Sequence, residues 1–361
     1  MVYQPNYERI AQKIVKESLR VQPGEQVVID VRADAVPYGE QIAVEIFKAG
    51  GVAALILHSD ELKYHQIMDT PTEQLALPER PAIAATGAAD FNINVGLFDA
   101  EPDRFRDLPD EKMRAYEMQR QHRRPALYGR EGARWLGTDY PTRYMAQLVG
   151  MTWTRFFEMF WRAMDIDYGD LRERAEEVAE RLASSTHIQI TTPRGTDLSL
   201  QRGERAIHKD DGIIRTLGNL PAGEVYFAPV EESAEGRLVA DQGYFQFERI
   251  SGLEFQIEGG VLTPLKAAQG FDLFMHQWEL ATGDKDHLGE IGIGINPELH
   301  TATGYPLTDD KVEGIVHLTL GRNDLTGGTN RSSFRWPVLL TQATIKLDDR
   351  LLLDKGRLVR R

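Results

Sequence analysis

Three ionisable side chains lie in apolar or glycine-bounded segments, where a charge costs stability unless it is paired or bound to a metal. Glu224 lies in NLPAGEVYFAP, Glu290 in HLGEIGIGINP, and His317 in GIVHLTLG. Two carboxylates and an imidazole that converge from separate strands can hold one or two divalent cations, which polarise a carbonyl and lower the pKa of bound water. A single strand histidine is more often simply hydrogen-bonded in a core, so the set of three carries the prediction. The pattern indicates hydrolase-like chemistry, with Glu224 and Glu290 as catalytic carboxylates and all three side chains as metal ligands.

Composition limits the chemistry further. The chain has 361 residues and no cysteine, so thiolate nucleophiles, disulfides and zinc–thiolate sites are excluded. Its 55 acidic residues outnumber 42 Lys plus Arg, which argues against a nucleic-acid partner and favours a small or peptide-like substrate. No apolar run approaches the length of a membrane span, and the amphipathic N-terminus does not resemble an export signal. We therefore expect a cytoplasmic protein without a membrane partner.

The first half of the chain is predicted to be an α/β domain over residues 1–165. A helix with apolar spacing, a Gly-containing turn and the strand VVIDV come first, followed by a second helix, Gly50-Gly51 and the strand VAALILH. Strand, helix, strand at this spacing predicts a parallel crossover and an open, mostly parallel sheet. We expect further buried strands near 82–85 and 91–95, and helix followed by an ordered loop between 99 and 142.

The second half, residues 166–361, is predicted to be a β-rich, mixed α+β domain that carries the putative active site. A helical stretch from 152 to 183 leads into it, and its Phe/Trp stripe is typical of core packing. Short alternating segments with Gly-rich turns follow, among them IQITT, VYFAPV, GRLVADQGYF, LEFQIEGGVL and ATIKLDD. They predict a mixed sheet or a partly closed barrel. Periodicity alone does not give the order of its strands.

Several segments, in one order, resemble the aminopeptidase T/aminopeptidase S family of metallopeptidases. They are YERIAQKIVKESLRVQPGEQVVI, RWLGTDYPT, NLPAGEVYFAPVEESAEGRLV, LGEIGIGINP, DDKVEGIVHLTLG and GGTNRSS. The resemblance covers nearly the whole chain and implies an α/β first domain, a β-rich second domain, a homodimer and a dinuclear metal centre that removes N-terminal residues from peptides. Position by position, it places metal ligands on Glu224, Glu290 and His317.

One segment departs from this family. After the N-x-S-S stretch, the family pattern has a His-x-Asp pair that supplies the two remaining ligands, whereas this sequence reads Phe334-Arg335-Trp336-Pro337. Arg335 stands in place of the histidine and Pro337 in place of the aspartate. A guanidinium has no lone pair to give, and proline has no side-chain donor. The usual set of five ligands is therefore incomplete.

Two arrangements can follow from these replacements. Arg335 can pair with Glu224 or Glu290, in which case no cation is needed. Alternatively, one zinc, cobalt or manganese ion can bind to Glu224, Glu290 and His317. Asp324 is a possible substitute ligand, although an acid in a GRNDLTGG turn is more often a turn residue. Other histidines nearby in the sequence are His276, His287 and His300.

The leading prediction is a metal-dependent, aminopeptidase-like hydrolase of small peptides or amides, with a degenerate metal site that is mononuclear or inactive. One alternative is a ring-opening or other small-molecule enzyme on the same scaffold, because dihydroxypyridine dioxygenases are similar to it. These enzymes also use the His-x-Asp pair that is missing here. The other alternative is a non-catalytic relative that binds a peptide or a small molecule. The metal content distinguishes the three.

Overall fold

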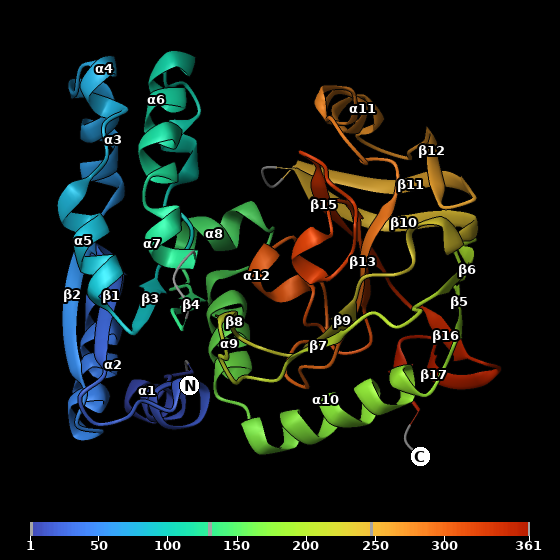
Figure 1. Ribbon diagram of the computed structural model, residues 1–361, viewed down its shortest axis with the longest axis horizontal. Helices are drawn as coiled ribbons and strands as arrows, with labels where there is room; N and C mark the ends of the chain where they lie inside the picture. The colour runs from blue at the N-terminus through green and yellow to red at the C-terminus, as the bar shows by residue number, and fades with distance from the viewer. Residues whose placement is uncertain (1–2, 129–131, 246–247, 360–361) are drawn as a thin grey trace. The chain divides into compact units, whose positions relative to one another are not determined.

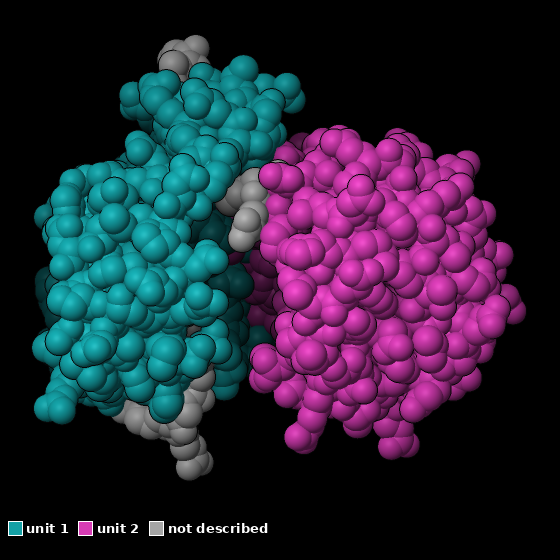
Figure 2. All heavy atoms as spheres, turned by 90° about the horizontal axis from the view of Figure 1, so that it is seen from above, with its two compact units in different colours: residues 1–165, 212–221 teal, residues 166–211, 222–361 magenta. Residues whose placement is uncertain are grey.

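The computed structural model describes residues 3–128, 132–245 and 248–359 (Figure 1). The chain forms two compact units, coloured in Figure 2: unit 1 comprises 1–165 with 212–221, and unit 2 comprises 166–211 with 222–361. The sequence prediction assigned all of 166–361 to the second domain. Residues 212–221 instead belong to unit 1, to which they contribute a strand.

Unit 1 is an open parallel sheet with helices, as predicted. Its strand order is β2-β1-β3-β4-β8, and every pairing in it is parallel. The strands are β1 (Gln26–Arg32), β2 (Val52–His58), β3 (Phe91–Val95), β4 (Arg134–Thr138) and β8 (Leu217–Leu220). The helices are α1 (Tyr7–Lys13), η1 (Ile14–Leu19), η2 (Ala33–Ala35), α2 (Val36–Lys48), α3 (Asp60–Asp69), α4 (Thr72–Leu75), α5 (Arg80–Ala88), η3 (Pro102–Phe105), α6 (Asp110–Gln121), α7 (Arg124–Tyr128), α8 (Arg143–Leu148) and α9 (Trp153–Met164).

Two local predictions for unit 1 were wrong. Residues 82–85 lie in helix α5 rather than in a strand. Alanine is the strongest helix former, and a proline in the first turn of this helix starts it without losing a hydrogen bond. Residues 134–138 form strand β4 rather than a loop, because they pair with β3 on one side and β8 on the other. Pairing with neighbouring strands makes residues 134–138 a strand, whereas their local sequence favours neither strand nor loop.

Unit 2 is β-rich, as predicted. Its main sheet runs β18-β17-β16-β5-β6-β10-β15-β14-β13-β9-β7, and β11 extends from β10 to β12. Helix α10 packs on β7 and β9, and helix α11 packs on β11 (Figure 1). The fold class, an α/β domain followed by a β-rich domain, is confirmed.

The strands of unit 2 are β5 (His187–Thr191), β6 (Asp197–Gln201), β7 (Ile207–Asp210), β9 (Glu224–Phe227), β10 (Glu235–Phe245), β11 (Glu248–Glu258), β12 (Val261–Lys266), β13 (Leu288–Gly294), β14 (Val316–Gly321), β15 (Arg335–Leu340), β16 (Thr344–Leu347), β17 (Arg350–Asp354) and β18 (Arg357–Leu358). The helices are α10 (Tyr168–Ala183), η4 (Glu231–Ser233), α11 (Phe271–Leu280), α12 (Pro306–Asp309) and η5 (Asp324–Thr326). Across the described ranges of both units, no helix combines the length and apolar character needed to cross a membrane.

Candidate metal centre

The candidate residues lie on one face of the sheet in unit 2, and the strand register explains why. Directly paired residues of neighbouring strands point to the same face, and side chains alternate along each strand. Gly292 of β13 pairs with His317 of β14 and with Tyr226 of β9. Two residues to either side of Gly292 along β13, Gly294 pairs with Glu224, and Glu290 pairs with Thr319. Glu224, Glu290 and His317 therefore share a face across β9, β13 and β14.

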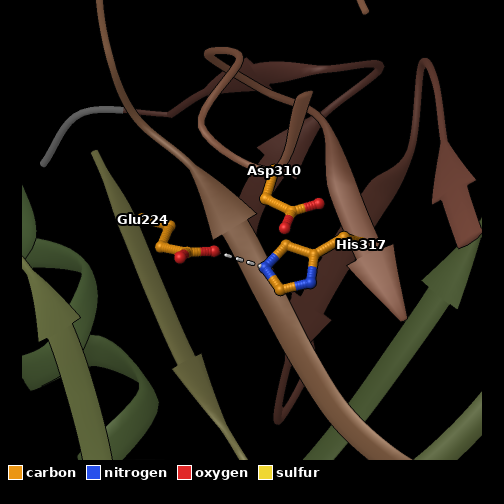
Figure 3. Close-up of side chains that lie close together, drawn as sticks. All are labelled: Glu224, Asp310 and His317. Carbon is orange, nitrogen blue, oxygen red and sulfur yellow. Dashed lines mark ion pairs between the residues drawn. The ribbon is translucent and has the colours of Figure 1, made fainter. Parts of the chain in front are cut away.

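Glu224, Asp310 and His317 form a tight cluster on this face (Figure 3). One ligand atom from each side chain lies within 4.8 Å of the other two. Nε2 of His317 is 2.8 Å from Oε2 of Glu224. The His317 side chain is 2% exposed, and in the described part of the chain neither ring nitrogen has a hydrogen-bond partner. The contact with Glu224 is thus a close ion pair without hydrogen-bond alignment.

Gly292 leaves the space that the His317 ring fills. A Cβ atom at Gly292 would lie 1.8 Å from Nε2 of His317, far inside van der Waals contact. Any side chain at this position would push the imidazole away from Glu224. The Gly-Ile-Gly pattern of β13 therefore serves the site directly, by letting the ring lie flat across the neighbouring strand.

Asp310 and Lys311 reach the cluster from the segment between α12 and β14. Nζ of Lys311 lies 3.0 Å from Oε1 of Glu224 and 3.7 Å from Oδ2 of Asp210. The lysine side chain is 4% exposed, so this ammonium is almost fully removed from water. Asp210, the last residue of β7, faces the site because it is paired with Glu224.

The protonation of these groups follows from burial and from their neighbours. Burial alone would lower the pKa of His317, but the charges of Asp310 and Glu224 raise it to about 9. Burial would raise the pKa of Glu224, but the Lys311 ammonium and His317 lower it. Burial raises the pKa of Asp210, and Lys311 only partly opposes it. A divalent cation would have to displace the proton on His317 before it could bind there.

Arg335 pairs with one of the predicted ligands. Its Nη2 lies 3.4 Å from both carboxylate oxygens of Glu290, whose side chain is 6% exposed, while the arginine side chain is 51% exposed. Burial raises the pKa of Glu290, and the charges of His317 and Arg335 oppose this rise. Pro337 is paired with Thr319, so its ring occupies the same face without offering a ligand.

Asp324 does not join the cluster. Its carboxylate binds the guanidinium of Arg322 at 2.5 Å in the exposed turn after β14. His287 contacts Asp286 at 3.0 Å. His276 and His300 are exposed, and neither belongs to the cluster found among the described residues. Asp310, rather than Asp324 or these histidines, lies beside Glu224 and His317.

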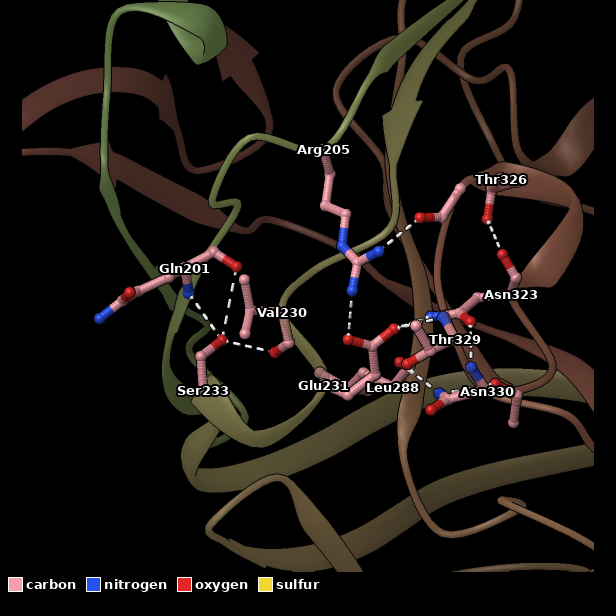
Figure 4. A network of polar contacts seen from close by, with 12 residues as sticks. Gln201, Arg205, Val230, Glu231, Ser233, Leu288, Asn323, Thr326, Thr329 and Asn330 are labelled. Carbon is pink, nitrogen blue, oxygen red and sulfur yellow. Dashed lines mark hydrogen bonds and ion pairs between the residues drawn. The ribbon is translucent and has the colours of Figure 1, made fainter.

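A second polar group supports the strands from outside the cluster (Figure 4). In this group, which we call the clamp, Glu231 accepts from Nη2 of Arg205 at 2.6 Å and from Nδ2 of Asn323 at 3.1 Å. Oδ1 of Asn323 accepts from the Asn330 amide at 2.7 Å. Nδ2 of Asn330 donates to the carbonyls of Leu288 (3.2 Å) and Gly321 (3.0 Å). The clamp therefore ties the start of β13 to the end of β14.

Sequence reasoning missed Asp210, Tyr226, Asp310 and Lys311. Asp310 and Lys311 lie in DDKVEGIVHLTLG, the segment that contains His317, and the charged run before a buried strand was the available signal. Tyr226 lies two residues after Glu224 on the same face, and its ring stacks on His208 with 5.1 Å between centroids. Burial raises the pKa of Tyr226, and the charges of Glu224 and Glu290 add to the rise. No sequence pattern distinguished Tyr226 from a core tyrosine.

The cluster fits a divalent metal ion. Two carboxylates and an imidazole are ligands that zinc and similar cations accept, and three protein ligands leave positions open for water and substrate. Nε2 of His317 lies beside the Glu224 carboxylate, and Asp310 offers a further ligand atom within 4.8 Å of both. Glu224 and Asp310 would hold the ion together with His317, whereas Glu290 is engaged by Arg335.

Comparison with known proteins gives relatives of similar length. Aminopeptidase T of Thermus thermophilus is 22% identical over 92% of this chain and 89% of its own length; that of Thermus aquaticus is 22% identical over 91% and 88%. Among solved structures, wild-type AmpT from Thermus thermophilus aligns with a TM-score of 0.76 at 18% identity, covering 98% of this chain and 99% of its own. A 2,5-dihydroxypyridine dioxygenase from Pseudomonas putida aligns with a TM-score of 0.65 at 16% identity, covering 98% and 97%. These two likenesses describe the fold.

The family model described as thermophilic metalloprotease (M29) matches residues 3–341. This range covers most of both units and every residue of the cluster. The resemblance to aminopeptidase T inferred from the sequence segments is confirmed. The chain belongs to the M29 family of metalloproteases.

Proposed function

We propose that this protein is a metal-dependent, aminopeptidase-like hydrolase of small peptides or amides that uses one divalent cation. The observation that carries the proposal is the cluster of Glu224, Asp310 and His317, whose ligand atoms lie within 4.8 Å of one another, in a chain of a metalloprotease family. A zinc, cobalt or manganese ion at this cluster would polarise a substrate carbonyl and lower the pKa of a bound water. The metal set differs from the predicted one in that Asp310 takes the place of Glu290.

The remaining groups on the same face have separate roles in this proposal. Glu290 is a buried carboxyl with a raised pKa, which suits it to accept a proton from water and return it to a leaving amine. Glu224 is held by Lys311 and His317 and acts as a ligand rather than as a base. Arg335, which is half exposed beside Glu290, can bind a carbonyl or carboxylate oxygen of the substrate.

The test is hydrolysis of amino-acid anilides and dipeptides by chelator-treated protein to which zinc, cobalt or manganese is restored. We expect metal-dependent release of the N-terminal residue, and Glu290→Gln should lower kcat by about 100-fold without weakening metal binding. The matched control is Glu254→Gln on β11, which removes a carboxylate paired with Arg237 of β10. It should leave kcat unchanged. Metal-loaded protein that cleaves none of these substrates would contradict the proposal.

A non-catalytic binding role is the second candidate, and the two positively charged side chains beside the carboxylates favour it. Lys311 and Arg335 already neutralise part of the charge that a metal would otherwise neutralise. Calorimetry with a non-hydrolysable dipeptide analogue separates the roles, since binding without turnover supports this candidate. We also propose a cytoplasmic homodimer, which follows from the family resemblance and which a monomer mass in light scattering would contradict.

A further inference from the structure

Lys311 is a buried cation inside the candidate metal centre. Its ammonium lies 3.0 Å from Oε1 of Glu224, while Oε2 of the same carboxylate faces His317 at 2.8 Å. Asp210 lies on the other side of the ammonium, at 3.7 Å. One carboxylate of the metal cluster is thus shared between a fixed positive charge and the position where a metal would bind.

The backbone around Lys311 places this ammonium firmly. The Lys311 amide donates to the carbonyl of Thr308 at 3.0 Å, and its carbonyl accepts from the amide of Asn296 at 3.0 Å. The next residue, Val312, passes so close to β13 that a Cβ at Gly294 would lie 2.1 Å from its carbonyl oxygen. The charge of Lys311 is therefore part of the folded site rather than a mobile side chain at its edge.

The charges explain what this arrangement does. A divalent cation at Glu224, Asp310 and His317 would be repelled by a unit charge only one carboxylate away, in a region from which water is largely excluded. The same ammonium partly neutralises the negative charges of Glu224 and Asp210, which would otherwise attract the metal ion. Both effects act in one direction, against metal binding.

We propose that Lys311 is a built-in competitor of the metal, one that weakens the binding of the single ion and keeps further ions away from Glu224 and Asp210. This inference rests on the proposed metal site. The opposite role is a supporting one, in which Lys311 orients Glu224 for the metal and strengthens its binding. The two roles predict changes of opposite sign when the charge is removed.

The experiment is calorimetric titration of Mn²⁺ and Zn²⁺ into the chelator-treated full chain and its variants. Lys311→Gln keeps a hydrogen-bond donor for Glu224 but removes the charge, and it should bind Mn²⁺ at least about tenfold more tightly. Lys311→Arg keeps the charge and should stay within about threefold of the unmodified protein. Lys346→Gln, at an exposed position on β16, is the matched control for loss of one lysine and should change nothing.

An affinity of Lys311→Gln that is unchanged or weaker would overturn the inference. If this variant fails to fold, as judged by circular dichroism, the double variant Lys311→Gln/Asp210→Asn removes both partners of the buried pair and should still bind at least about threefold more tightly. Equal binding by this double variant and the unmodified protein would also overturn it. Tight binding by Lys311→Gln without any peptide cleavage would support the competitor and contradict the proposed hydrolase, so the two claims fail separately.

Discussion

The clamp and the metal cluster are both buried polar groups of unit 2, but they differ in how their hydrogen bonds are satisfied. In the clamp, Glu231 accepts bonds from Arg205, Asn323 and the Thr329 amide, and the donors point at their acceptors. In the cluster, Nε2 of His317 lies 2.8 Å from Oε2 of Glu224 without hydrogen-bond alignment, and Nδ1 has no hydrogen-bond partner among the described residues. Satisfied networks stabilise a fold, whereas unsatisfied buried groups persist where they serve a ligand. The difference distinguishes two polar groups that contact the same strands, β13 and β14.

The largest effect should come from the clamp. Glu231→Ala leaves the guanidinium of Arg205 and the amide of Asn323 without their acceptor, and should lower the free energy of unfolding by about 3 kcal/mol. Urea denaturation measures this change. Glu232→Ala, at the exposed neighbouring position, should stay within about 0.5 kcal/mol. Similar losses for both variants would mean that the clamp is not the cause.

The next effect should come from the cluster, and on binding rather than on stability. His317→Gln removes the imidazole ligand and should weaken Mn²⁺ binding by about 100-fold or more. The free energy of unfolding should change less than in Glu231→Ala, because His317→Gln removes one ion pair with Glu224, whereas Glu231→Ala leaves two donors without an acceptor. Calorimetry and urea denaturation on the same sample test both parts. Severe destabilisation with unchanged metal affinity would reverse the roles assigned to the two groups.

A gain of binding should follow when the two replaced ligands are restored. Arg335→His with Pro337→Asp removes the charge beside Glu290 and adds two possible metal ligands on the same face. The double variant should bind the metal about tenfold more tightly. Arg335→Lys is the control that keeps the positive charge, and it should leave the affinity unchanged. Equal affinities for the double variant and the control would show that β15 does not reach the metal position.

The smallest effect should come from Asp324. Its carboxylate already binds Arg322 in an exposed turn, so Asp324→Asn should change metal affinity by less than about twofold and stability by less than about 1 kcal/mol. The measurement is the same Mn²⁺ titration. A tenfold loss of affinity would make Asp324 a ligand and would extend the cluster beyond Glu224, Asp310 and His317.

Most of the fold could be predicted from the sequence because its patterns are local. The strands VVIDV, VAALILH and GIVHLTLG are apolar runs between clear turn residues, and each is a strand in the structure. Residues 82–85 and 134–138 were harder, since an alanine-rich run and a short mixed run suit more than one conformation. The strand β8 joins the first sheet from far along the chain, and no local pattern reports such a pairing.

The candidate site was partly predictable for a similar reason. Glu224, Glu290 and His317 stand out because each is an ionisable group in an apolar or glycine-bounded strand. Asp310 and Lys311 do not, since charged residues in a connecting segment are usually solvated. Their role depends on the path of the chain across β13, which brings Lys311 to Glu224 over 87 residues of sequence. Only the three-dimensional contacts bring Asp310 beside Glu224 and His317 and pair Glu290 with Arg335.

The central claim is that one divalent ion binds between Glu224, Asp310 and His317. Anomalous diffraction from crystals soaked in Mn²⁺ or Zn²⁺ tests it most directly, because it locates each ion without reference to activity. We predict one anomalous peak in contact with these three side chains and none beside Glu290, where Arg335 lies. A pair of peaks that includes Glu290, or no peak at the cluster at saturating metal, would contradict the account.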